Sequence, residues 1–373
     1  MKKIVFLTGT RADFGKLKSL IFSVQKSPEL ESHVFVTGMH MLAKYGPTHI
    51  ELDKAGVKNM YKYINQRSGT DMDVALSNTI IGFSNYVHEV KPDLIIVHGD
   101  RVEALAGAIV GSFNTILVGH IEGGEISGTI DEFIRHSITK LANVHFVSNK
   151  VAAKRLVQMG ENADSIFEIG SPDIDVMLNS NLPGIASVKK RYEINFDSYK
   201  ILLYHPVTTE LLSLKERAGE VVDACIESGE KFVVIYPNND KGTEIIFKAY
   251  EKFHGNDRFR LLPSMRFEFF LSLLKHSTGI VGNSSAGIGE AGVYGVPAIN
   301  VGSRQYNRSK CDSIVHAPED KDKIIECLKK IEGLRIPCNF EFGDGKSTER
   351  FMSILDRGDL WKIKHQKQFV DIS

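Results

Sequence analysis

Several features that would define a specialised protein are absent from this sequence. Its 373 residues contain four cysteines, none of them in a C-x-x-C pair or grouped with histidine at metal-ligand spacing: Cys225, Cys311, Cys327 and Cys338. We therefore expect reduced thiols and no structural zinc. No stretch approaches the roughly 20 apolar residues of a membrane span. The apolar run Ile4–Leu7 is too short for a signal peptide, so we expect a cytoplasmic protein without a membrane partner.

Excess charge is also absent. Lysine plus arginine and aspartate plus glutamate number 46 each, so the formal net charge is zero. Nonspecific nucleic-acid binding requires a basic surface, and the composition argues against that function. It leaves room for a local basic pocket that binds a small anion.

The first glycine-containing loop lacks the common cofactor motifs. It reads Gly9-Thr10-Arg11-Ala12-Asp13-Phe14-Gly15-Lys16, which matches neither G-x-G-x-x-G nor the P-loop pattern. We therefore predict no nicotinamide or flavin cofactor, and no metal. Arg11 could bind a phosphate with its guanidinium group, and the alternative is a surface ion pair with Asp13.

Short apolar runs alternate with helical patterns along almost the whole chain. Such runs, separated by helices, predict an α/β protein with parallel sheets covered on both faces. The alternation breaks near 170–189, where Ser171-Pro172 and Pro183-Gly184 indicate a linker, and then restarts. We predict two doubly wound Rossmann-like domains, residues 1–175 and 176–349, with a cleft between them. A C-terminal helix at about 350–373 is expected to pack back on the first domain.

One turn in the second half is suited to binding a phosphate. Gly282-Asn283-Ser284-Ser285-Ala286-Gly287 follows an apolar strand and precedes a helix predicted over 288–294. Backbone N–H groups and the positive end of the helix dipole converge at such a turn, and two hydroxyl groups add donors. Glycines 282 and 287 would allow a ligand close to the backbone. The alternative is an ordinary serine N-cap.

Acidic and imidazole side chains follow two strands of the first half. His98-Gly99-Asp100-Arg101 follows one strand, His120-Ile121-Glu122-Gly123-Gly124-Glu125 ends the next, and Asp131-Glu132 opens a helix. Ligands of doubly wound sheets bind at the carboxyl ends of strands. These carboxylates therefore suit general acid–base chemistry, although Asp100 and Asp131 could instead be N-caps.

Further polar residues follow the strands of the second half. His205 could hydrogen-bond a leaving phosphate, or it could be a satisfied histidine at a strand end. Asn238 and Arg304 follow two other strands. Glu290, placed two turns into the helix opened by Ser285, could hold the hydroxyl groups of a ribose or could lie on a solvated helix face. A nucleoside-diphosphate sugar fits this combination.

Several motifs of this sequence, taken together, resemble those of the UDP-N-acetylglucosamine 2-epimerases. They are Gly9–Asp13, Val36–His40, His98–Arg101, His120–Glu125, Ile130–His136 and Gly282–Ser285. The resemblance extends over nearly the whole chain and is strongest to the hydrolysing branch of bacterial sialic-acid synthesis. The other branch usually has His-x-Glu-Ala-Gly-Leu-Arg and Pro-Glu-Glu, where this chain has His120–Glu125 and Ile130–Glu132.

The resemblance implies a B-type glycosyltransferase architecture and a set of site residues. It implies that Asp100, Glu122 and Asp131 are catalytic carboxylates and that His205 lies near the diphosphate. It further implies substrate contacts at these positions: Arg11, Ala12, His40, His98, Arg101, His120, Asn238, Ser284, Ser285, Gly287, Glu290 and Arg304. Members of the family suggest a homodimer or a dimer of dimers.

The implied reaction converts UDP-N-acetylglucosamine and water to N-acetylmannosamine and UDP, without a cofactor. Four alternatives stay open. They are the non-hydrolysing epimerase, a hydrolysing epimerase for a UDP-2,4-diacetamido-trideoxyhexose, a glycosyltransferase of the same architecture, and a silent nucleotide-sugar sensor. The last two would not need the three acidic positions.

Overall fold

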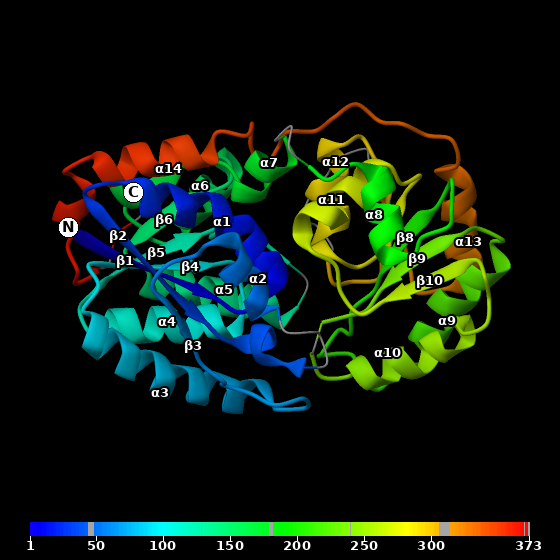
Figure 1. The fold of residues 1–373 in the computed structure, drawn as a ribbon, viewed down its shortest axis with the longest axis horizontal. Helices are drawn as coiled ribbons and strands as arrows, with labels where there is room; N and C mark the ends of the chain where they lie inside the picture. The colour runs from blue at the N-terminus through cyan, green and yellow to red at the C-terminus, as the bar shows by residue number, and fades with distance from the viewer. Residues whose placement is uncertain are drawn as a thin grey trace. The chain divides into compact units, whose positions relative to one another are not determined.

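Two parallel β-sheets with helices on both faces organise the chain in the computed structural model (Figure 1). The structure describes residues 1–43, 48–127, 129–178, 182–238, 240–305, 314–368 and 370–371. It divides into two units. Unit 1 comprises Met1–Glu125, Asp131–Asn179 and Glu341–Ser373, and unit 2 comprises Ile126–Ile130 and Ser180–Phe340. The predicted α/β class with two doubly wound sheets is confirmed.

The sheet of unit 1 is parallel throughout its described strands, in the order β3-β2-β1-β4-β5-β6-β7. Strand order therefore reverses between β1 and β4. The strands are β1 Lys2–Thr8, β2 Leu30–Val36, β3 Met60–Lys62, β4 Leu94–His98, β5 Leu117–Ile121, β6 Val144–Val147 and β7 Ile166–Glu168.

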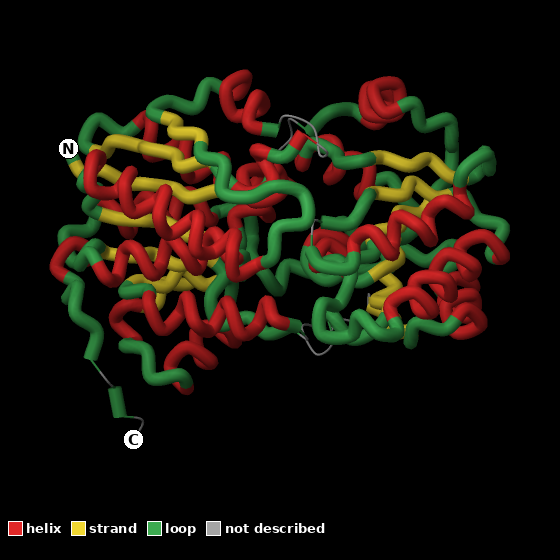
Figure 2. Tube along the Cα trace, turned by 90° about the horizontal axis from the view of Figure 1, so that it is seen from below, coloured by secondary structure: helices red, strands yellow, loops and turns green. Residues whose placement is uncertain are grey.

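Helices cover both faces of this sheet, α3 and α4 on one side and α1 and α14 on the other (Figure 1), and Figure 2 shows the same layers from below. The helices are α1 Arg11–Lys26, α2 His49–Ala55, α3 Met72–Val90, α4 Val102–Phe113, α5 Ile130–Leu141, α6 Lys150–Gln158, α7 Pro172–Met177 and α14 Ser347–Asp356.

The C-terminal helix α14 is part of the core of unit 1. Phe351 is fully buried, and its ring packs against Phe6 of β1 and Phe146 of β6, with ring centroids 6.4 and 5.0 Å apart. Ile354 and Leu355 belong to the same apolar cluster as Leu17 of α1. Phe351, which lies near the end of the chain, thus packs against strands formed by the first half of the chain.

The sheet of unit 2 has the order β10-β9-β8-β11-β12-β13 and reverses between β8 and β11. The strands are β8 Lys200–Leu203, β9 Phe232–Ile235, β10 Phe259–Leu262, β11 Ile280–Gly282, β12 Ala298–Val301 and β13 Ile314–Ala317. The helices are α8 Ile185–Tyr192, α9 Leu214–Glu227, α10 Thr243–Tyr250, α11 Phe267–Lys275, α12 Glu290–Val293 and α13 Lys321–Lys330.

Three short strands at the edges of the sheets were not predicted from the sequence. Strands β3, β7 and β13 have three or four residues each and partly exposed side chains, so they lack the apolar run that identifies a buried strand. Part of the segment predicted as a linker is helix α7. Pro172 begins that helix, because proline is well suited to the first helical position.

The described cysteines are free. Cys225 and Cys327 are buried and Cys338 is exposed, while Cys311 lies outside the described residues. Within the described parts of the chain, no helix combines the length and the apolar character that crossing a bilayer requires.

A buried carboxylate attaches the C-terminal segment to unit 1. Glu161 accepts hydrogen bonds from Lys140 at 2.8 Å, from His145 at 3.0 Å and from Lys367. Its side chain is 1% exposed. Burial would raise the pKa of Glu161, but these three partners outweigh burial and lower the pKa to about 2. The charge of Glu161 therefore ties residues after α14 to β6 and α5.

We predict that Glu161→Gln destabilises unit 1. Removing one partner of a buried ionic cluster leaves uncompensated charge and costs about 3–5 kcal/mol. Because the folded pKa of Glu161 is lowered, its contribution is present above the unfolded carboxyl pKa and is lost as pH falls toward 2. Urea denaturation at pH 7 and pH 3.5 should show a smaller loss at the lower pH. The exposed Glu168→Gln on β7 is the control, and equal stability of both variants at pH 7 would refute the prediction.

Candidate functional site

Several of the predicted site residues follow strands at the two points where strand order reverses. In unit 1, the Gly9–Lys16 segment follows β1 and His98–Arg101 follows β4, its neighbour. In unit 2, His205 follows β8 and Asn283–Ser285 follows β11, again its neighbour. At such a reversal the connecting loops turn away to opposite sides and leave space at the carboxyl ends of the strands, where doubly wound proteins bind ligands.

In unit 1, Asp100 pairs with an arginine of the following helix. Arg135 of α5 donates from Nη2 to Asp100 Oδ2. Arg135 is 2% exposed, whereas the Asp100 side chain is 26% exposed. Asp131 lies one helical turn before Arg135, so the two residues share a face of α5. The cation therefore orients the more accessible carboxylate. Arg101 is the N-cap residue of α4, and its side chain makes no capping hydrogen bond.

Beside this pair, His98 lies between two carboxylates. Its Nδ1 is 2.8 Å from Asp13 Oδ1, and its Nε2 is 3.3 Å from Glu122 Oε2. The side chains of all three residues are at most 12% exposed. The second contact is an ion pair rather than a well-aligned hydrogen bond. β4, β5 and α1 thus bring a charged triad together.

Glu122 is held on its other oxygen as well. Ser171 donates to Oε1, and Lys16 Nζ lies 3.8 Å from the same atom. Lys16 also pairs with Asp173 Oδ2 at 3.0 Å. The backbone of Glu122 has a φ of 62°, in the left-handed region that non-glycine residues seldom adopt. Glu122 therefore has an unusual backbone conformation in the turn after β5, and donors from other segments surround its carboxylate.

The environment gives His98 and Glu122 opposite charges. Burial would lower the pKa of His98, but Glu122 and Asp13 outweigh it and raise the pKa to about 10. Burial would raise the pKa of Glu122, but Lys16 and His98 hold it well below its usual range. At neutral pH Glu122 is a carboxylate that could accept a proton, and His98 is a cation.

Two other predicted histidines are fully buried. The ring nitrogens of His120 contact the Gly99 carbonyl at 2.8 Å and the Thr139 hydroxyl at 3.4 Å. His40 contacts the hydroxyls of Thr8 and Thr48 at 3.1 and 2.7 Å. Burial lowers the pKa of His120 to about 3 and that of His40 to about 4. Both are neutral groups that brace loops, so direct substrate contact by either histidine stays a prediction.

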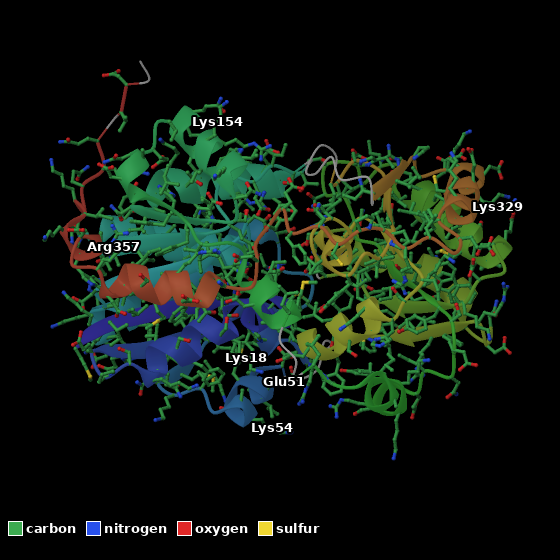
Figure 3. All side chains as sticks on the ribbon, turned by 90° about the horizontal axis from the view of Figure 1, so that it is seen from above. Lys18, Glu51, Lys54, Lys154, Lys329 and Arg357 are labelled. Atoms are coloured by element: carbon green, nitrogen blue, oxygen red, sulfur yellow. The ribbon has the colours of Figure 1, made fainter. Side chains whose placement is uncertain are left out.

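The predicted arginines of unit 1 have acidic partners. Arg11 Nη2 is 3.1 Å from Glu51 Oε1 of α2, and Figure 3 labels Glu51 on that helix. The alternative of an Arg11–Asp13 pair is therefore not what the structure shows. Arg101 Nε is 3.4 Å from the buried Glu103. Ala12 lies in the first turn of α1 beside Arg11.

Four residues of this cluster were absent from the predicted site: Asp13, Lys16, Ser171 and Asp173. Asp13 and Lys16 follow β1 in the loop already considered for phosphate, and the Thr10-x-x-Asp13 spacing of a capped helix start was a usable signal. Ser171 and Asp173 lay in a segment interpreted as a linker. Recognising the helix start at Pro172 would have pointed to them.

In unit 2, the small-residue turn begins as an N-cap. Ser284 accepts a hydrogen bond from Ala286 N at 3.3 Å, and Ser285–Gly287 forms one 3-10 turn. Helix α12 starts only at Glu290 and has four residues. The predicted continuous helix over 288–294 is therefore wrong. Ser284 and Ser285 are partly exposed at the N-terminal end of the turn, where N–H groups have no acceptor within the helix.

The glycines of this turn serve packing within the protein. A Cβ on Gly282 would lie 2.0 Å from the Leu203 carbonyl oxygen, and its φ is 131°. A Cβ on Gly287 would meet Ala298 Cβ at 3.6 Å. A side chain at position 282 would therefore collide with β8, so strand packing requires this glycine. That the two glycines let a ligand approach the backbone stays a prediction. A small hollow lined by Ser284, Gly287 and apolar side chains of the sheet adjoins the turn.

Asn283 links this turn to the loop after β8. Its Oδ1 accepts from His205 N at 2.7 Å, and its Nδ2 donates to the His205 carbonyl at 2.8 Å. The His205 ring in turn accepts a hydrogen bond on Nδ1 from Asn238 N at 3.1 Å. His205, Asn238 and the serine turn are thus held in one network at the reversal point of the sheet. Asn283 was not predicted as a site residue.

Two further predicted residues lie close to the turn. Arg304 Nη1 donates to the Asn283 carbonyl at 3.2 Å. Glu290 is 4% exposed at the start of α12, so the alternative of a solvated helix face is wrong. A cation, two hydroxyls and a buried carboxylate are therefore collected around one turn. In the described residues of both units, no group of three or more His, Cys, Asp or Glu side chains is arranged to hold a metal ion.

Comparison with known proteins identifies the family. A family model described as UDP-N-acetylglucosamine 2-epimerase matches residues 23–356. The chain belongs to the UDP-N-acetylglucosamine 2-epimerase family. An enzyme of that name from Neisseria meningitidis serogroup B is 46% identical, with all of both chains covered.

Other relatives of the family carry different names. The chain is 34% identical to the polysialic acid biosynthesis protein P7 of Escherichia coli, over 87% of this chain and 85% of that protein. It is 32% identical to the UDP-N,N'-diacetylbacillosamine 2-epimerase (hydrolyzing) of Legionella pneumophila, over 95% and 96%. The fold matches the UDP-N-acetylglucosamine 2-epimerase of Methanocaldococcus jannaschii, solved with UDP-N-acetylglucosamine and UDP, with a TM-score of 0.82, 24% identity and coverage of 95% and 99%.

We predict that Gly282→Ala and Gly287→Ala differ sharply in stability. The first places a methyl group against the Leu203 carbonyl at a φ of 131°, and the second makes an ordinary van der Waals contact. Gly282→Ala should cost at least about 2 kcal/mol of unfolding free energy, through overpacking and backbone strain. Gly287→Ala should cost under about 1 kcal/mol. Thermal and urea denaturation of both variants measures the difference, and equal stability would show that β8 and β11 can separate at no cost.

Proposed function

We propose that this protein is a hydrolysing 2-epimerase that converts UDP-N-acetylglucosamine and water to N-acetylmannosamine and UDP, for sialic-acid synthesis. The observation that carries the proposal is the grouping of Asp100 and Glu122 at the ends of adjacent strands, with Asp131 at the start of α5, in a member of this family. The hydrolysing assignment is supported by the sequence motifs and by the name of the Legionella relative, a hydrolysing 2-epimerase.

The chemistry explains why carboxylates are needed. Carbon 2 of the sugar carries an acetamido group and has no adjacent carbonyl, so its proton is only weakly acidic. Breaking the C1–O bond lets UDP leave with the bonding electrons and places positive charge on C1. A carboxylate can then remove the C2 proton, which leaves a 2-acetamidoglucal. Water adds at C1 while a proton is delivered to the opposite face of C2, and N-acetylmannosamine results.

The proposal gives the candidate residues of each unit a different role. In unit 2, Ser284, Ser285, His205 and Arg304 would stabilise the charge of the departing diphosphate, and Glu290 would hold the ribose hydroxyls. In unit 1, Glu122 is ionised, as a base must be, and its contacts with Ser171 and His98 hold it in one orientation, so we assign it the role of base. Asp100 and Asp131 are the remaining candidates for the acid. Arg11 would bind phosphate by exchanging its contact with Glu51.

Proton NMR in deuterated water tests the proposed reaction. With UDP-N-acetylglucosamine as substrate, we expect free UDP and N-acetylmannosamine that carries deuterium at C2. A UDP-linked manno product would replace the proposal with the non-hydrolysing epimerase. Turnover only of a UDP-2,4-diacetamido-trideoxyhexose, the substrate class that the name of the Legionella relative indicates, would keep the mechanism and change the substrate.

We predict that Ser285→Ala weakens UDP binding by about 1–3 kcal/mol, the usual cost of losing a hydrogen bond to a charged group. The matched control is Ser228→Ala, which removes a partly exposed hydroxyl that donates to the Cys225 carbonyl at the end of α9. Isothermal titration with UDP should show the loss for the first variant alone. Unchanged affinity in Ser285→Ala would place the diphosphate away from this turn.

A further inference from the structure

Asp13 contacts the His98 ring, although the two residues are far apart in the sequence. It lies in the first turn of α1, and its backbone N–H donates to the N-cap hydroxyl of Thr10 at 3.1 Å. Its Oδ2 accepts from Gly9 N at 3.0 Å, which leaves Oδ1 directed at His98 Nδ1, 2.8 Å away. The Gly9 N–H therefore holds one oxygen of the side chain while the other oxygen meets the imidazole ring.

The His98 ring has a carboxylate at each nitrogen. A neutral imidazole carries one N–H and one lone pair, so one of the two carboxylates would face a lone pair. Protonation gives both nitrogens a hydrogen and resolves this repulsion. Asp13 on α1 and Glu122 after β5 are the charged groups that contact the ring, and Lys16 acts on it through Glu122. The neighbouring His120 is neutral.

Glu122 depends on this cation for its own state. His98 contacts its Oε2, whereas Ser171 and Lys16 contact its Oε1. A neutral His98 that keeps its hydrogen on Nδ1 for Asp13 would turn a lone pair toward Oε2 of Glu122, so the attraction on that oxygen would be lost. Lys16 and His98 together keep Glu122 ionised, and His98 is the group that contacts Oε2. Asp13, on the far side of the ring, therefore acts on that oxygen through His98.

We propose that Asp13 is a positioning residue for Glu122: it holds His98 as a cation, and the cation keeps the Glu122 carboxylate ionised and in place. The proposal rests on the proposed function, in which Glu122 accepts the proton from the sugar. Asp13 itself contacts the His98 ring and the loop backbone, so its effect reaches the reaction only through His98.

The variant Asp13→Asn keeps the size of the side chain and removes its charge. An opposite charge at hydrogen-bonding distance shifts a pKa by about 1–3 units. In the parent enzyme, His98 stays protonated up to a pH of about 10. We therefore expect the alkaline fall in kcat to move down by about 1–3 pH units in Asp13→Asn, while KM changes less than kcat. Asp13→Glu should recover much of the parent profile.

A direct readout separates this proposal from the proposed function. NMR of protein with 13C-labelled histidine, assigned with His98→Gln, gives the titration of the His98 ring without substrate. A lower pKa in Asp13→Asn supports the proposal even if the substrate differs. If UDP-N-acetylglucosamine is not turned over but the His98 pKa falls, only the proposed function fails.

The control is Glu31→Gln, which removes the carboxylate of another histidine pair in unit 1, 2.9 Å from His33. It should leave the alkaline limb of kcat and the His98 titration unchanged. If Asp13 serves only to start α1, Asp13→Asn will lower thermal stability and leave both the pH profile and the His98 pKa in place. That result overturns the proposal. If Asp13→Asn does not fold, the same titration in Asp13→Glu must still show a protonated His98 at pH 8.

Discussion

The reversal of strand order in each sheet is the constraint on which the rest of the structure depends. β1 adjoins β4 although about 85 residues lie between them, and β8 adjoins β11 in the same way. Each reversal brings together the ends of two strands whose following loops are far apart along the chain. Asp13 meets His98 for this reason, and Asn283 meets His205 for the same reason. Both candidate sites are products of one topological rule applied twice.

In unit 1, the surroundings of a histidine side chain rather than its residue type decide its charge. His98 and His120 lie at the carboxyl ends of adjacent strands, His98 largely buried and His120 fully buried. His98 is flanked by two carboxylates and remains a cation, whereas His120 faces a carbonyl and a hydroxyl and is neutral. The same fold thus produces one charged group that acts on Glu122 and one uncharged group that supports the Gly99 loop. Burying the triad of Asp13, His98 and Glu122 is tolerable because each charge has an opposite partner.

Much of the fold could be predicted from the sequence, because apolar runs identify buried strands locally. The loops after the strands ending at His98 and Ile121 were found this way, and so was the serine turn after β11. The pairing of Asp13 with His98 could not be predicted, since it depends on which strands adjoin. The edge strands β3, β7 and β13 carry too few buried apolar side chains to be recognised. The position of Glu290 was misjudged because one 3-10 turn interrupts the predicted helix.

The packing of α14 has a consequence for biogenesis. Unit 2 is formed mainly by one continuous stretch, Ser180–Phe340, whereas unit 1 needs Glu341–Ser373 as well. During synthesis, residues of unit 2 leave the ribosome before Phe351 can fill its place between Phe6 and Phe146. The first sheet therefore keeps apolar surface exposed until the residues of the second sheet have been synthesised. Unit 1, whose strands are made first, can therefore be completed only after unit 2 has been synthesised.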